Sequence, residues 1–235
     1  MNLIDIVALL ILAICVLGGY YRGFISTGLN ILAGIFSFLI ALALVPAVSG
    51  VVKEHETLYN SILYYTEGSE YVAKTSVELI RTPISELPGE RIEEVIRNAS
   101  MPNPMGRAVG RNIARQAFAA EDITTLGDYF NLTIVSVFLN ILSILAVFFV
   151  IRILLALLIR GIDYGRGGYP VLVQWDGAIG AGLGLIDGIL LLFVLFMLIP
   201  IVLTVLPKFY ELLSDSAFGE FFYQANFLLY FVPAT

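Results

Sequence analysis

The sequence contains one cysteine, Cys15, and one histidine, His55. A single cysteine excludes a disulfide within the chain and a thiolate metal cluster. A single histidine excludes a multi-histidine metal site. The sequence also lacks a recognisable pair of aspartates, or a serine and histidine set, of the kind that catalysis would need. We therefore expect no catalytic residue, no bound metal and no cofactor, and hence no enzyme.

Charged residues are scarce as well. They make up 14% of the 235 residues, whereas 59% are hydrophobic. A soluble domain has about 25% charged and about 45–50% apolar residues, and a soluble core of this size cannot hide the excess apolar surface. The net charge of −6 disfavours a nucleic-acid partner, because phosphate binding needs a basic face. The composition predicts a membrane protein with the lipid bilayer as its partner.

Four apolar segments are long enough to cross a bilayer, which takes about 20 helical residues. They cover residues 3–21, 24–48, 132–159 and 177–206. Pro46 and Gly50 are expected to end the second segment, and Pro200 and Pro207 the fourth. The segments lack the alternation of barrel strands. The sequence predicts an all-α, polytopic membrane protein whose parts are 1–52, 53–130, 131–207 and 208–235.

Residues 53–130 differ in composition from the apolar segments, since they hold 8 of the 13 basic and 12 of the 19 acidic residues. After Pro88 and Gly89, apolar residues recur at i, i+3, i+4 and i+7, which predicts an amphipathic helix. These residues are Ile92, Val95, Ile96 and Ala99. Arg107, Arg111 and Arg115 fall on one face of a further helix, either solvated or in contact with anionic lipid or an acidic partner. We expect a mostly helical insert outside the bilayer.

The orientation of the spans follows from the basic residues of the short loops. Arg22 lies in the first loop, and Arg160 and Arg166 lie in the third. These loops are expected on the cytoplasmic side, which places the N-terminus, the insert and the C-terminus outside. The tail 208–235 carries nine aromatic residues in 28, a composition typical of a segment lying at the membrane interface.

The fourth apolar segment carries a regular row of glycines, since Gly180, Gly184 and Gly188 recur every four residues. Such a row forms a groove on one helix face into which a neighbouring helix packs closely. Lining of a pore or substrate path is the alternative. A nucleotide-binding glycine fingerprint is excluded because no strand precedes the glycines.

Two motifs carry a resemblance to a known family. Asp5 near the chain start is followed by Arg22, Gly23 and Phe24 in a very short turn, and Asp176 is followed by the glycine row. This ordered set resembles the colicin V production protein (CvpA) family. The resemblance implies a small inner-membrane protein with four helices and an outside N-terminus, active in toxin production or export or in envelope homeostasis. Gly177 and Asp187 stand where the family often has basic residues, and its shortest members lack the insert.

Two charges lie well inside their predicted spans. Asp187 lies about 15 Å into the fourth helix, and Arg152 lies about 12 Å from the same membrane face. Because an unpaired carboxylate inside a membrane is costly, we predict an interhelical pair between them. Alternatively, Arg152 snorkels to the interface and Asp187 is protonated or faces water. Asn30 and Asn140 are further candidates for hydrogen bonds between helices.

The sequence leaves two functions open. One is an export-accessory or homeostasis protein that works through contacts between helices and with other membrane proteins or further copies of the chain. The other is a subunit of an oligomeric channel or small-solute transporter, in which Asp187, Arg152 and the glycine row line the path.

Overall fold

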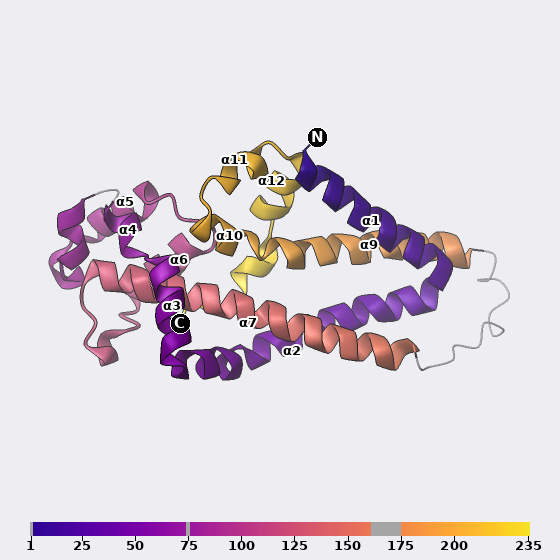
Figure 1. Cartoon of the computed structure of the whole chain (residues 1–235), viewed down its shortest axis with the longest axis horizontal. Coiled ribbons are helices and arrows are strands. Elements are labelled where there is room, and N and C mark those ends of the chain that lie inside the picture. Colours follow the sequence, from indigo (N-terminus) through magenta and orange to yellow (C-terminus); the bar gives the residue numbers. More distant parts are fainter. Residues whose placement is uncertain (1, 74–75, 161–174) are drawn as a thin grey trace. The chain divides into compact units, whose positions relative to one another are not determined.

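The computed structural model describes residues 2–73, 76–160 and 175–235, and in this part of the chain the ordered elements are all helical (Figure 1). Among the described residues, four helices have the length and apolar composition to cross a bilayer. They are Leu3–Arg22, Phe24–Glu54, Leu126–Ile159 and Asp176–Val205. The prediction of an all-α polytopic membrane protein is confirmed.

The second span is longer than the sequence predicted. Helix α2 runs from Phe24 to Glu54 and continues through Pro46 and Gly50 without a break. The predicted end of the segment at these residues is therefore wrong. Proline removes a single backbone donor, and a long apolar helix tolerates that loss because its remaining hydrogen bonds stay intact.

The third span also differs from its prediction at one end. Helix α7 covers Leu126–Arg160 and so begins six residues before the predicted segment. The hydroxyl of Thr125 accepts a hydrogen bond from the backbone N–H of Asp128 at 3.3 Å and donates to its carboxylate at 2.6 Å. These two hydrogen bonds cap the N-terminus of α7. The helix therefore begins in a stretch that is too polar for hydropathy to assign to the span.

The fourth span consists of two helices. Helix α9 covers Asp176–Phe196, and α10 covers Ile199–Val205 with Pro200 in its first turn. The helix is interrupted before Pro200, where the ring fits the first turn but cannot supply a donor to the preceding one.

The insert consists of short helices, as predicted. They are α3 (Glu56–Thr66), α4 (Ser69–Ala73), η1 (Val77–Arg81), η2 (Ile84–Glu86), α5 (Gly89–Asn98), α6 (Met105–Ala114) and η3 (Ala119–Glu121). Val95 and Ala99, from the predicted apolar stripe, are fully buried. The side chains of Arg107, Arg111 and Arg115 are exposed.

The described chain divides into two compact units. One comprises Met1–Leu44, Ile144–Met197 and Lys208–Leu228, and the other comprises Val45–Ser143, Leu198–Pro207 and Leu229–Thr235. The division at residues 52, 130 and 207 that the sequence suggests stays a prediction.

The tail folds into three short helices, α11 (Phe209–Ser214), α12 (Ala217–Gln224) and η4 (Phe227–Tyr230). Within the first unit, α12 packs against α1 (Leu3–Arg22) and α9. The ring of Phe193 on α9 meets Phe222 and Phe227 edge-on, with ring centroids 5.0 and 5.3 Å apart. Part of the aromatic content of the tail thus serves packing, while its placement at a membrane interface stays a prediction.

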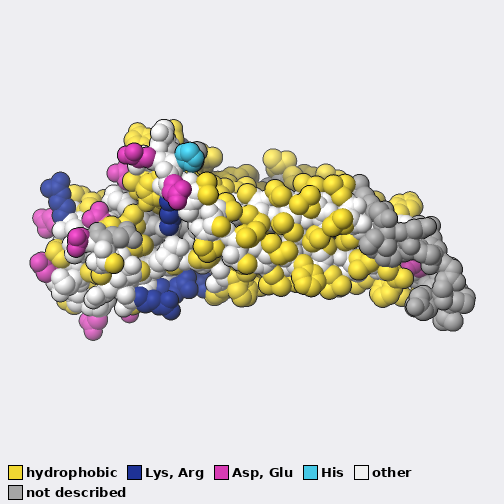
Figure 2. All heavy atoms as spheres, turned by 90° about the horizontal axis from the view of Figure 1, so that it is seen from below, with side chains coloured by type: hydrophobic (Ala, Val, Ile, Leu, Met, Phe, Trp, Pro, Cys, Tyr) yellow, Lys and Arg dark blue, Asp and Glu magenta, His cyan; other side chains and the backbone are white. Residues whose placement is uncertain are grey.

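Large hydrophobic side chains are exposed along the spans. On the face drawn in Figure 2 they form a broad apolar surface. Exposed members on α2 include Leu32, Ile35, Phe36 and Leu39, and those on α7 include Val150, Ile153, Leu154 and Leu157. Surface of this kind requires lipid as its solvent.

Candidate functional site

The glycine row of α9 lies against α1, and the two helices run side by side (Figure 1). Gly180, Gly184 and Gly188 are all buried. A Cβ added to Gly180 would collide with the backbone oxygen of Gly19, and one added to Gly184 with the backbone oxygen of Cys15. Only hydrogen at these positions lets the two backbones approach this closely.

The turn between α1 and α2 is bound to the start of α9. The backbone N–H of Phe24 donates to the carboxylate of Asp176 at 2.7 Å. Gly23 has φ +81°, and a Cβ on it would collide with the same carboxylate. Glycine is therefore required twice here, for the positive φ and for the close approach. Asp176 supplies an acceptor and a negative charge to the N-terminus of α2.

This contact unites the two motifs on which the family resemblance rests. Gly23 and Phe24 come from the first motif and Asp176 from the second, 152 residues later than Phe24. Arg22 is exposed, and its guanidinium lies over Gly18, where an added Cβ would be 3.7 Å from Nη2. The arginine therefore folds back along its own helix, whereas the aspartate links two helices.

Asp5 performs two tasks at the other end of α1. Its carboxylate accepts from the backbone N–H of Asn2 at 2.9 Å, which completes a capping box with the Asn2 side chain. It also accepts from the hydroxyl of Ser216 at 2.7 Å and the backbone N–H of Phe218 at 3.1 Å. Asp5 is only 2% exposed.

The link between Asp5 and the tail was not expected from the sequence. Ser216 is the N-cap of α12, where its hydroxyl accepts from the backbone N–H of Gly219 at 2.8 Å. A serine directly before a short aromatic helix was the available signal. Its partner 211 residues away could not be chosen from spacing.

Arg152 and Asp187 lie together between spans of the first unit. Arg152 Nη2 is 3.2 Å from one carboxylate oxygen of Asp187 and 3.4 Å from the other, and the side chains are 20% and 21% exposed. Arg152 also donates through Nη1 to the backbone oxygen of Asn30 on α2. One guanidinium thus links α2, α7 and α9.

A glycine on α2 makes room for the guanidinium of Arg152. Gly34 lies one turn after Asn30, and a Cβ on it would be 3.7 Å from Cζ of Arg152. The residue at i+4 normally shields a helical carbonyl with its side chain. Because residue 34 is glycine, the guanidinium of Arg152 reaches the backbone oxygen of Asn30. The side-chain amide of Asn30 donates within its own helix, to the oxygen of Ser26 at 3.0 Å.

Asn140 on α7 binds the last residues of the chain within the second unit. Its amide nitrogen donates to the backbone oxygens of Pro233 and Thr235, both at 3.1 Å. Its side-chain oxygen is buried without a partner in the described part of the chain. The hydrogen bonds of Asn140 therefore join a span to the irregular end of the tail, and not two spans to each other.

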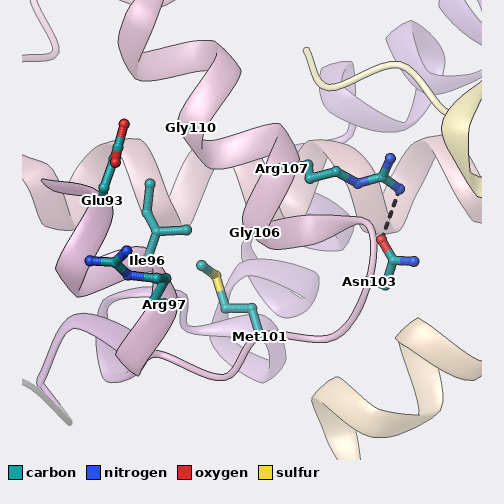
Figure 3. A pocket seen from close by; sticks show the side chains of 8 residues that line it. All are labelled: Glu93, Ile96, Arg97, Met101, Asn103, Gly106, Arg107 and Gly110. Atoms are coloured by element: carbon teal, nitrogen blue, oxygen red, sulfur yellow. Dashed lines mark hydrogen bonds between the residues drawn. The ribbon is translucent and has the colours of Figure 1, made fainter. Parts of the chain in front are cut away.

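Among the described residues, no group of three or more His, Cys, Asp and Glu side chains is placed to hold a metal ion. An open hollow of about 470 Å³ lies between α5 and α6 (Figure 3). Ile96 and Met101 line it, and so do Arg107 and Asn103, whose side chains are hydrogen-bonded to each other. Arg166 and the rest of the third loop, 161–174, lie outside the described residues.

The helices and their contacts define a polytopic α-helical membrane protein. Residues 4–74 match the family model described as Colicin V production protein. The match confirms the resemblance and covers Asp5, Arg22, Gly23 and Phe24, but not Asp176 or the glycine row. No curated protein and no solved structure matches the chain.

Proposed function

We propose that this protein acts as a scaffold in the inner membrane, in toxin production or export or in envelope homeostasis. The observation that carries the proposal is the pairing of Asp187 with Arg152, whose guanidinium also binds the Asn30 backbone oxygen. Two charges inside the spans are thereby used to hold three helices together. In a scaffold such charges stay paired, whereas a conducting path needs them accessible to water.

The close contact of α1 with α9 supports the same proposal. Backbone atoms of Gly19 and Cys15 occupy the places where side chains of Gly180 and Gly184 would project. A glycine face that is already filled by a neighbouring helix contributes to a rigid framework. The broad apolar surface left outside (Figure 2) suits lipid and other membrane proteins, including further copies of the chain.

A subunit of an oligomeric channel or small-solute transporter is the second candidate. The observation that favours it is the partial exposure of the Arg152 and Asp187 side chains, which are 20% and 21% exposed. Flux of protons and small ions into liposomes containing the purified protein separates the two. We expect wild type, Asp187→Asn and the control Asp215→Asn to match empty liposomes. Flux in wild type and in the control that Asp187→Asn abolishes would contradict the scaffold and favour the channel.

The proposed orientation places the N-terminus, the insert and the C-terminus outside the cytoplasm. Thiol labelling in whole cells tests this orientation. The single cysteine is removed by Cys15→Ala, and a new one is placed at the exposed Ser61 of α3. We expect Ser61→Cys to react with a membrane-impermeant maleimide before lysis. Reaction only after lysis would contradict the orientation.

A further inference from the structure

Helix α6 is basic on one face and buried on the other. Arg107 and Arg111 are exposed, as is Arg115 at the C-terminal end of the helix. The buried face consists of Met105, Ala108, Val109, Asn112 and Ile113. The apolar face is therefore already covered, while the guanidinium groups point outward from the insert.

This helix is anchored to two membrane spans near their ends, and all these residues belong to the second unit. The amide of Asn112 donates to the hydroxyl of Thr133 at 2.9 Å, two turns into α7. The hydroxyl of Thr204 contacts the sulfur of Met105 at 3.5 Å, in the last turn of α10. The third span has 34 residues, which makes about 50 Å of helix against a hydrocarbon core of about 30 Å. Its first turns can thus stand at the level of the headgroups, and α6 with them.

Arg107 is held in place by contacts that leave its charge uncompensated. Its Cζ lies 3.7 Å from the ring centroid of Tyr230, and Nη2 donates to the side-chain oxygen of Asn103 at 2.8 Å. Tyrosine and asparagine are neutral, so neither contact neutralises the guanidinium. A planar guanidinium fixed against an aromatic ring is well suited to bind phosphate with its remaining N–H groups.

We propose that Arg107 and Arg111 form a binding site for the phosphate of an anionic phospholipid headgroup. The charges are complementary, and lipid is the neighbour that the spans bring to this helix. Tyrosine beside a basic residue is also the combination that proteins place at membrane interfaces. A solvated basic face would need neither the fixed guanidinium nor the anchoring to two spans. Arg107 also lines the hollow of Figure 3, but the proposed site consists of the exposed guanidinium groups of Arg107 and Arg111.

Native mass spectrometry of the full chain in detergent tests the site. The protein is mixed with equal amounts of dioleoyl phosphatidylglycerol and dioleoyl phosphatidylcholine, which differ in headgroup charge. We expect wild type to retain the anionic lipid preferentially. Arg107→Gln/Arg111→Gln is expected to lower the ratio of bound anionic lipid to bound phosphatidylcholine by about fivefold or more. A fivefold change is roughly what one arginine contributes to binding at an anionic membrane surface.

The matched control removes the same charge elsewhere in the insert. Arg81→Gln/Arg91→Gln alters two arginines outside α6, of which Arg91 is paired with Glu94, and should keep the wild-type ratio. An equal drop in this control would overturn the proposal, since the lipid would then respond to net charge alone. No drop in the Arg107/Arg111 variant would overturn it too.

Two measurements on wild type keep the test decisive if the double variant fails to fold. Preferential retention of the anionic lipid should weaken as the ionic strength rises, because the contact is electrostatic; a preference independent of salt would overturn the proposal. Inorganic phosphate in large molar excess over the lipid should displace no more lipid than sodium chloride at the same ionic strength. Greater displacement by phosphate than by sodium chloride would show a site for free anions and overturn the assignment to lipid.

Discussion

The carboxylate of Asp176, the first residue of α9, accepts a hydrogen bond from the backbone N–H of Phe24, the first residue of α2, at 2.7 Å. A residue late in the chain thus caps a helix near its beginning. Gly23 in the intervening turn is forced to be glycine by its φ of +81° and by the carboxylate itself. The turn between the first two spans is therefore completed only when the fourth span is in place.

Removal of this cap is expected to destabilise the protein. Asp176→Ala should lower the free energy of unfolding by about 1 kcal/mol, as loss of an N-cap does, and Asp176→Asn by less because it keeps an acceptor oxygen. Thermal unfolding in detergent measures both. Asp215→Ala, which removes an exposed carboxylate from the tail, should match wild type. Equal stability of Asp176→Ala and this control would contradict the capping role.

Two glycines of α9 make a matched pair of test positions. A Cβ at Gly184 would collide with the backbone oxygen of Cys15, whereas a Cβ at Gly182 would meet nothing within 4 Å. Gly184→Ala is expected to cost about 1–3 kcal/mol through forced separation of α1 and α9. Gly182→Ala should be neutral or slightly stabilising, because alanine favours the helix by about 1 kcal/mol over glycine. The same denaturation curves report both, and similar effects at the two positions would refute the close contact.

The pairing of Arg152 with Asp187 predicts non-additive substitutions. Arg152→Leu and Asp187→Leu should each cost about 2–3 kcal/mol, since each leaves a charge inside the spans without its partner. The double variant should cost less than the sum by about 1 kcal/mol or more. The half-exposed surface pair Arg91 and Glu94, at 2.6 Å, provides the comparison, with a coupling below about 0.5 kcal/mol. An additive double variant at 152 and 187 would show that the two groups do not interact.

Gly34 is expected to tolerate one methyl group and no more. A Cβ there would lie 3.7 Å from Cζ of Arg152, which is ordinary van der Waals contact. Gly34→Ala should keep the coupling between Arg152 and Asp187, whereas Gly34→Leu should displace the guanidinium and reduce that coupling. Repeating the double-mutant cycle in both backgrounds measures this. Full coupling in the leucine background would mean that Gly34 does not give access to the Asn30 oxygen.

The contact between Asp5 and Ser216 is expected to fasten the tail. Ser216→Ala removes both the donor to Asp5 at 2.7 Å and the cap of α12, so limited proteolysis should cut the tail several times faster. Ser214→Ala is the matched control, because that exposed hydroxyl bonds locally to the oxygen of Glu211 at 3.0 Å. Equal cleavage of the two variants would argue against the link.

Features of this fold that depend on local sequence were predictable, and those that depend on distant residues were not. The apolar segments located the four spans, because hydropathy and length are properties of the local sequence. The same local reasoning failed at Pro46. The tendency of proline to end a helix was overridden there by the continuity of a long apolar helix. The predicted pair of Arg152 and Asp187 came from matching depths, a simple constraint that membrane spans impose.

The sequence alone determined that this chain spans a membrane with helices, that its insert is helical and that one helix carries a row of glycines. Only the tertiary structure decided which residues those elements bring together: Asp176 with Phe24, Asp5 with Ser216, and the glycine row with the backbone of α1. The reason is physical. Burial in lipid depends on the composition of each segment, whereas a cap or a close helix contact depends on where a distant segment lies.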